Sequence, residues 1–158
     1  MRTTTLLPLT LLALIGCSSA PVYLEAYGHF GDGTPIDFRE DAMLQVGTDP
    51  LTGDLTAHIR AVTRSGAAFT GMVVQVDLAV ITAPGQYATH HDGSGGAQLH
   101  ILTGDPDNTE EWMADGTLDI LELPIDGNDR FAGSFSSVVV SYQGQDITGE
   151  QGTFRGQL

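Results

Sequence analysis

The densest group of metal-capable side chains in this sequence is His90-His91-Asp92, followed by His100 in the next apolar stretch. Imidazole nitrogens suit zinc or copper, and a strand carrying His100 could face a loop carrying the other three side chains. The spacing matches neither H-E-x-x-H nor H-x-H, and adjacent residues on a strand point to opposite faces. His90 and His91 can therefore converge only in a loop, which the glycine-rich stretch 93–96 favours. The alternative is a solvated polar hairpin without a metal.

A second candidate site is the acidic run 105–111, which combines four carboxylates with an amide and a hydroxyl. Its candidate calcium ligands are Asp105, Asp107, Asn108, Glu110 and Glu111. Calcium takes about six to eight oxygen ligands from a loop, so the inventory is suitable. An EF-hand needs glycine and glutamate where this run has Glu110 and Gly116, so that motif is absent. Surface-loop composition alone accounts for most such runs.

No catalytic group emerges from the remaining polar residues. The sequence lacks a G-x-S-x-G elbow, and Gly133-Ser134-Phe135-Ser136 falls within a predicted strand. Asp119 and Glu122 fall on opposite faces of a predicted strand, whereas a glycosidase needs two carboxylates facing one bond. Trp112 and the tyrosines could present a ligand face, although such residues more often cap a core. We therefore assign no catalytic residues, and a protein without enzymatic activity is favoured.

The only cysteine, Cys17, follows a short apolar run over residues 6–15 with Arg2 before it. That run is too short to cross a bilayer, which requires about 20 apolar residues. Leu14-Ile15-Gly16-Cys17 resembles the bacterial lipobox, which implies a lipoprotein with diacylglycerol on the thiol and cleavage before the cysteine. We expect a lipoprotein signal peptide over 1–16 and a lipidated tether over 17–21. The alternative is an ordinary secretory signal peptide with Cys17 as a bystander.

The lipobox resemblance also predicts where the protein resides. Ser18 after the cysteine resembles the outer-membrane sorting signal of enteric-type bacteria, so we expect a lipid-anchored protein of the bacterial cell envelope, at the outer membrane. Each buried CH₂ contributes about 0.8 kcal/mol, so two or three acyl chains anchor stably. With Cys17 consumed, no disulfide can form within the chain, and the fold must rest on its core.

Charge and composition narrow the choice of partners. The formal net charge is −14, and the sequence contains no lysine. Nucleic-acid affinity depends on neutralising phosphates, so we do not expect a nucleic-acid partner. The acidity is explained by solubility more simply than by a cation-binding role. Twenty glycines, 41% hydrophobic residues and 16% charged residues fit a turn-rich β protein better than a disordered one.

Hydrophobic residues alternate with period two along most of the chain, and no stretch predicts a helix of three turns. The clearest alternation covers residues 72–80, with one wholly apolar face. Further strands are expected at 22–30, 42–46, 55–61, 86–89, 98–102, 118–123, 130–142 and 154–158, separated by turn sequences. We predict an all-β fold in one domain over 22–158, an antiparallel β-sandwich or partly closed barrel of about eight to ten strands.

The last third of the chain carries a repeated glycine–aromatic pattern. Its segments are Phe131-Ala132-Gly133-Ser134-Phe135, Asp146-Ile147-Thr148-Gly149 and Gly152-Thr153-Phe154-Arg155-Gly156. They resemble the ends of several uncharacterised bacterial lipoprotein families, in which a G-x-F strand precedes an I-T-x-G closing strand. The resemblance implies a small β-sandwich lipoprotein and brings no site residues with it.

Together these features predict a membrane-anchored envelope lipoprotein whose β-sandwich is a binding or interaction module for an envelope protein or a glycan. Calcium is the cofactor that the acidic run would admit. One alternative is a metal-dependent envelope enzyme that uses His91, Asp92 and His100, and another is a purely structural envelope protein. Three ligands converging in a concave pocket would favour the enzyme, whereas scattered, exposed histidines would favour the binding module. A surface without pockets would favour the structural protein.

Overall fold

The computed structural model describes residues 22–30, 33, 35–48, 53–62, 69–105, 108–142 and 145–158, of which 30, 36, 69, 70, 104, 105, 108, 109, 141, 142 and 145–150 are described by backbone only. Within these ranges the chain forms ten strands and no helix. The strands are β1 (Tyr23–Phe30), β2 (Pro35–Thr48), β3 (Leu55–Val62), β4 (Phe69–Asp77), β5 (Gly85–Thr89), β6 (Ala97–Asp105), β7 (Asn108–Met113), β8 (Asp115–Glu122), β9 (Arg130–Tyr142) and β10 (Gln145–Gln157).

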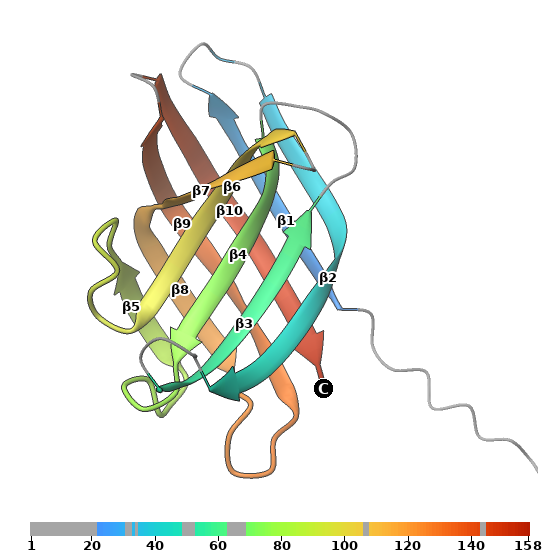
Figure 1. Cartoon of the computed structure of the whole chain (residues 1–158), viewed down its shortest axis with the longest axis vertical. Helices are drawn as coiled ribbons and strands as arrows, with labels where there is room; N and C mark the ends of the chain where they lie inside the picture. The colour runs from blue at the N-terminus through green and yellow to red at the C-terminus, as the bar shows by residue number, and fades with distance from the viewer. Residues whose placement is uncertain are drawn as a thin grey trace, which may run out of the picture.

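The ten strands make one antiparallel sheet, in the order β5-β8-β9-β10-β1-β2-β3-β4-β6-β7. The long strand β2 is where the sheet bends, because its residues 35–41 pair with β1 and its residues 42–48 pair with β3. The half on the β1 side thereby faces the half on the β3 side, and the two form the layers of a sandwich (Figure 1). The end strands β5 and β7 are not paired with each other, so the sheet stays open.

The hydrophobic core fills the space between the two halves. In β3 the odd residues 57, 59 and 61 are buried, while His58 and Arg60 point outward, as the period of a strand requires. The other half contributes the three largest fully buried side chains, Phe131, Phe135 and Phe154. Burying one phenylalanine side chain contributes about 1.5–3 kcal/mol, so these rings are a large part of the core's stabilisation.

Strands β9 and β10 place a glycine opposite a phenylalanine at three inward positions. The pairs are Phe131 with Gly156, Gly133 with Phe154, and Phe135 with Gly152. A side chain on these glycines would collide with the core, since a Cβ built on Gly133 would lie 2.8 Å from Phe154 Cζ. The rings of Phe131 and Phe154 are 4.9 Å apart between centroids. At Gly133 and Gly152 the ring of the facing phenylalanine lies over the glycine, whereas Gly156 is approached by Leu44 and Ile59. Close packing in the core therefore explains the G-x-F pattern.

The predicted all-β fold is confirmed, with ten antiparallel strands in one bent sheet. The strand predicted over 72–80 ends earlier than expected, at Asp77. The Asp77 carboxylate accepts a hydrogen bond of 2.8 Å from the Ala79 N–H, and the turn that follows leaves Val80 exposed. A carboxylate that accepts a hydrogen bond from the backbone N–H two residues later favours a turn. Here this turn ends the strand, although the alternation of apolar residues continues to Val80.

Two further segments differ from the expected turns and loops. Residues 149–152, expected as a turn, lie inside β10, where the register with β1 shifts between Tyr27 and Gly28. The glycines there allow a β-bulge rather than a chain reversal. Residues 108–111, part of the acidic run 105–111 that was expected as a surface loop, instead begin β7, which pairs with β6 from Asn108 to Met113. Charged residues are common on edge strands, where they discourage pairing with other chains.

Residues 1–21 lie outside the described residues. The predicted signal peptide, the lipidated Cys17 and the tether over 17–21 therefore remain predictions. Among the residues that the structure does describe, no helix is long and apolar enough to cross a membrane.

Candidate functional site

Strands β7 and β8 are joined by one residue, Ala114, at which the chain passes from one half of the sheet to the other (Figure 1). Both backbone groups of Ala114 are hydrogen-bonded, because its N–H donates to the Leu99 carbonyl over 2.8 Å and its carbonyl accepts from Thr89 Oγ over 2.9 Å. Ala114 and Thr89 are buried. The satisfied backbone fixes this corner, which positions the side chains on either side of it.

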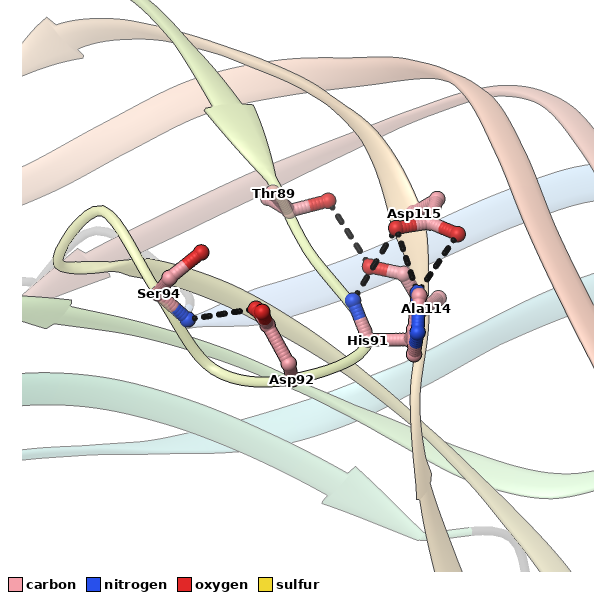
Figure 2. Close-up of polar contacts among 6 residues, drawn as sticks. All are labelled: Thr89, His91, Asp92, Ser94, Ala114 and Asp115. Carbon is pink, nitrogen blue, oxygen red and sulfur yellow. Dashed lines mark hydrogen bonds and ion pairs between the residues drawn. The ribbon is translucent and has the colours of Figure 1, made fainter.

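The loop after β5 is attached to this corner through His91 and Asp115 (Figure 2). The Asp115 carboxylate accepts the His91 backbone N–H over 3.0 Å, and His91 Nδ1 lies 3.0 Å from Asp115 Oδ2. These two hydrogen bonds, the backbone bond first, hold the pKa of Asp115 below its usual value. The His91 side chain is 75% exposed. The contact therefore orients a solvent-facing imidazole and leaves its other nitrogen open to a ligand.

Asp92 is engaged within the same loop. Its carboxylate accepts the Ser94 backbone N–H over 3.0 Å, which holds the pKa of Asp92 below its usual value (Figure 2). Gly93, Gly95 and Gly96 have φ values of 75°, 88° and 78°. Only glycine adopts such angles without strain, so the glycines make the loop that the sequence predicted for this segment.

A second group of polar side chains lies on the outer face of β3, β6 and β7. His100 Nδ1 lies 2.8 Å from Glu111 Oε1, and Arg60 Nη1 lies 3.7 Å from Glu111 Oε2. The hydrogen bond from His100 lowers the pKa of Glu111 most, and the charges of His100, Arg60 and His58 lower it further. His100 is buried to 9% exposure although it points away from the core. Glu111 thus contacts both His100 and Arg60, and neither of these pairs was predicted from the sequence.

The structure does not bring the predicted metal ligands together. His91 pairs with Asp115, Asp92 caps its own turn, and His100 pairs with Glu111 on the outer face. His90 is exposed and makes no hydrogen bond with the other three. No group of three or more histidine, cysteine or acidic side chains is placed to hold a metal among the described residues.

Four of the predicted calcium ligands lie on the paired strands β6 and β7, and the fifth, Asp107, lies outside the described residues. Asp105 and Asn108 face each other as the last backbone pair between β6 and β7. The side chains of Asp105, Asp107 and Asn108 lie outside the described residues. Glu110 and Glu111 are consecutive in β7, so their carboxylates point to opposite faces of the sheet. Of these two, Glu111 is already engaged by His100.

A cleft of about 530 Å³ opens beside β7 and its junction with β8. Besides His91, it is lined by Glu111, Trp112, Met113, Asp115, Val139 and Val140. The Trp112 indole packs against the core, and its N–H donates to Thr103 Oγ over 3.2 Å. The cleft therefore combines apolar walls with two carboxylates and an exposed imidazole, a composition typical of binding sites.

The cleft lies between two strand edges. β7 pairs only with β6, and β9 beyond Val139 pairs only with β10, among the strands that the structure describes. The backbone on the cleft side of each strand thus lacks a strand partner. Sequence reasoning missed this site, because the signal that defines it is the pairing of strands rather than any local motif.

Sequence reasoning also missed His58 and Arg60. Their alternation with the buried residues 57, 59 and 61 was the available signal, since it places both side chains on the outer face. Their direct neighbours on that face come from β2 and β4, and Arg60 also reaches Glu111 of β7. No local pattern indicates which strands pair.

Comparison of the chain with protein-family models, with curated proteins and with solved structures finds no match.

Proposed function

We propose that this chain is a non-enzymatic binding module, displayed in the bacterial cell envelope by lipid on Cys17, that binds an extended basic segment of an envelope protein. The single observation that carries the binding role is the cleft of about 530 Å³ between the free edges of β7 and β9. An extended peptide placed there adds a strand to either edge, and its main-chain groups pair with the backbone groups that now lack a strand partner.

The charge of the cleft supports a basic partner. Glu111 and Asp115 lie on its rim, and the whole chain has a formal net charge of −14. Such a field attracts a lysine- or arginine-rich segment and repels acidic ones. The apolar residues Trp112 and Val139 offer surfaces for every second side chain of the bound strand.

The placement of the histidines supports a binding module over a metal-dependent enzyme. A catalytic zinc site needs about three protein ligands around one open position. His91, Asp92 and His100 each have a different partner, and the first two are exposed. The presence of a cleft likewise favours a binding module over a purely structural protein.

The lipid anchor supports a location close to the membrane surface. Residues 18–21 between Cys17 and the domain span at most about 14 Å. Replacing the thiol in Cys17→Ser tests the anchor: we expect loss of processing before residue 17 and release of the protein from the membrane fraction. Unchanged processing and unchanged membrane association would refute the lipid anchor and leave the peptide-binding proposal untouched.

Binding is tested with the soluble domain and an eight-residue peptide of alternating lysine and valine. Because Trp112 is the only tryptophan, its fluorescence reports on the cleft directly. We expect saturable quenching by this peptide and none by the glutamate–valine analogue. N-methylation of alternate peptide nitrogens should weaken binding about tenfold or more, because it removes main-chain donors. Equal responses to all three peptides, or no response, would refute strand addition at this cleft.

The double substitution Glu111→Gln with Asp115→Asn removes both carboxylates from the rim. It should lower the affinity for the lysine–valine peptide about tenfold. Glu122→Gln with Asp119→Asn is the matched control, because these carboxylates lie on β8 outside the lining of the cleft. An equal loss in both variants would indicate a general charge effect rather than a site.

A further inference from the structure

Four uncharged hydrogen-bonding side chains form a row across the outer face of the sheet, away from the cleft. The row is Gln45, His58, Gln75 and Gln98, one residue from each of β2, β3, β4 and β6. The strand register makes each a direct neighbour of the next. Neighbouring strands are about 4.8 Å apart, so the row is about 14 Å long.

The surroundings of the imidazole in this row favour its uncharged form. Burial, and then the charge of Arg60, lower the pKa of His58. His58 Nε2 lies 2.8 Å from Gln45 Oε1, and we assign the ring proton to Nε2 because that oxygen is an acceptor. Nδ1 of the same ring is then an acceptor. Arg60, the adjacent cation on this face, is engaged by Glu111.

The row retains hydrogen-bonding capacity for a ligand. The Gln98 amide donates to the Gly93 carbonyl over 3.3 Å, and its oxygen lies 3.1 Å from His100 Nε2. In contrast, the Gln75 carboxamide has no hydrogen-bond partner within the described part of the chain. Gln75 therefore offers both a donor and an acceptor at the centre of the row.

A groove of about 620 Å³ runs over this part of the row. Its lining includes Gln45, His58 and Gln75, with Thr56 and Gly47 at the next positions along β3 and β2. No atom lies within 4 Å of the position that a Cβ on Gly47 would take, so the groove is open there. The Thr56 hydroxyl donates to the Gly47 carbonyl, which fixes one wall.

We propose that this row is a binding strip for a neutral oligosaccharide. Carboxamides and a neutral imidazole pair with hydroxyl groups as donors and acceptors at once, and the strand spacing presents one such group to each successive sugar ring. No unpaired cation is available in the row to hold a phosphate, sulfate or carboxylate, and the acidity of the chain disfavours polyanions. The strip is separate from the cleft beside β7, and it does not depend on a lipid anchor.

The test uses the soluble domain labelled with ¹⁵N and three neutral hexasaccharides, namely the β-1,4 hexamers of N-acetylglucosamine and of glucose and the α-1,4 hexamer of glucose. Dextran sulfate is the anionic comparison. We expect at least one neutral hexamer, at millimolar concentration, to shift the side-chain carboxamide signals of Gln45, Gln75 and Gln98. Shifts caused by dextran sulfate alone, or no shift with any hexamer, would overturn the proposal.

Two variants then locate the site. Gln75→Ala and Gln45→Ala should each lower the affinity for the bound hexamer by about tenfold, the change expected for lost hydrogen bonds. The control is Gln151→Ala, because Gln151 is an exposed glutamine on β10, in the other half of the sheet. Chemical shifts of the core methyl groups check that each variant is folded. Binding by both row variants at wild-type strength, or an equal loss in the Gln151 variant, would overturn the assignment of the strip.

Discussion

His100 Nδ1 donates a hydrogen bond of 2.8 Å to Glu111 Oε1 across the pairing of β6 with β7. This contact joins one residue of the predicted zinc or copper site to one residue of the predicted calcium site. Val73, which lies beside His100 in β4, is 5% exposed although it too points outward. The His100 end of the contact is therefore covered, whereas the Glu111 side chain is 46% exposed, and the hydrogen bond joins the edge strand β7 to β6.

We expect the free energy of unfolding to fall less steeply at acid pH in Glu111→Gln than in the wild type. The pKa of Glu111 is lowered in the folded protein, first by the His100 hydrogen bond, so the unfolded chain binds its proton more readily. Its stabilisation is thus complete above the unfolded carboxyl pKa of about 4.3 and is lost as the pH falls further. Urea unfolding between neutral pH and pH 3 measures this. Glu110→Gln, on the other face of β7, should retain the wild-type slope.

Thr89→Val should destabilise the corner between β7 and β8. Valine keeps the shape of threonine but removes the hydroxyl that donates to the buried carbonyl of Ala114 over 2.9 Å. A buried carbonyl left without a donor costs about 1–3 kcal/mol. Urea unfolding followed by Trp112 fluorescence gives the change in the free energy of unfolding. Thr117→Val, on the neighbouring strand β8, is the control, and equal losses in the two variants would contradict this account of the corner.

The predictable part of the fold is the part that side-chain period encodes. In β3, the buried residues 57, 59 and 61 alternate with outward polar ones, and that pattern predicts the strand and its inner face. The acidic segment of β7 does not predict a strand, because its polar residues are typical of loops. It forms one because β6 offers a pairing edge, which is tertiary information.

The contacts between the candidate site residues are even harder to predict from the sequence than the strands are. His90, His91 and Asp92 are close in sequence, yet each contacts a different residue: the His90 carbonyl accepts from Gly93, the Asp92 carboxylate accepts from Ser94, and His91 pairs with Asp115. The side chains that do meet come from different strands. Glu111 of β7, for example, contacts His100 of β6 and Arg60 of β3. Their meeting depends on which strands pair and in which register, and a single sequence does not contain that register in any local pattern.

We expect zinc to leave the melting temperature of the domain unchanged. His91, Asp92 and His100 are held by three different partners, so binding one zinc ion through all three would require breaking those contacts. A stoichiometric site stabilises a folded protein by several kcal/mol at ligand concentrations far above Kd. Calorimetric titration of the wild type and of His91→Ala should therefore give the same featureless curve. A one-to-one zinc site that His91→Ala abolishes would show that the loop rearranges to form the predicted site.

Gly152→Ala should be far more destabilising than most glycine substitutions in strands. The added Cβ would overlap the Phe135 ring and the Glu25 carbonyl, and the two strands that carry these groups cannot both move aside. Overpacking of this kind costs about 3 kcal/mol. Gly47→Ala in β2 is the matched control: it has open space around it and should stay within about 0.5 kcal/mol of the wild type.

The pairing of Gly152 with Phe135 can be separated from a general intolerance of alanine by a double-mutant cycle. Phe135→Leu removes the ring that the new Cβ would meet, so Gly152→Ala should cost less in that background than in the wild type. The expected coupling is about 1–2 kcal/mol, because the two residues are in direct cross-strand contact. Urea unfolding of the four proteins measures it. Additive effects would mean that the Glu25 carbonyl, rather than the ring, excludes a side chain at Gly152, and that the G-x-F pattern has another origin.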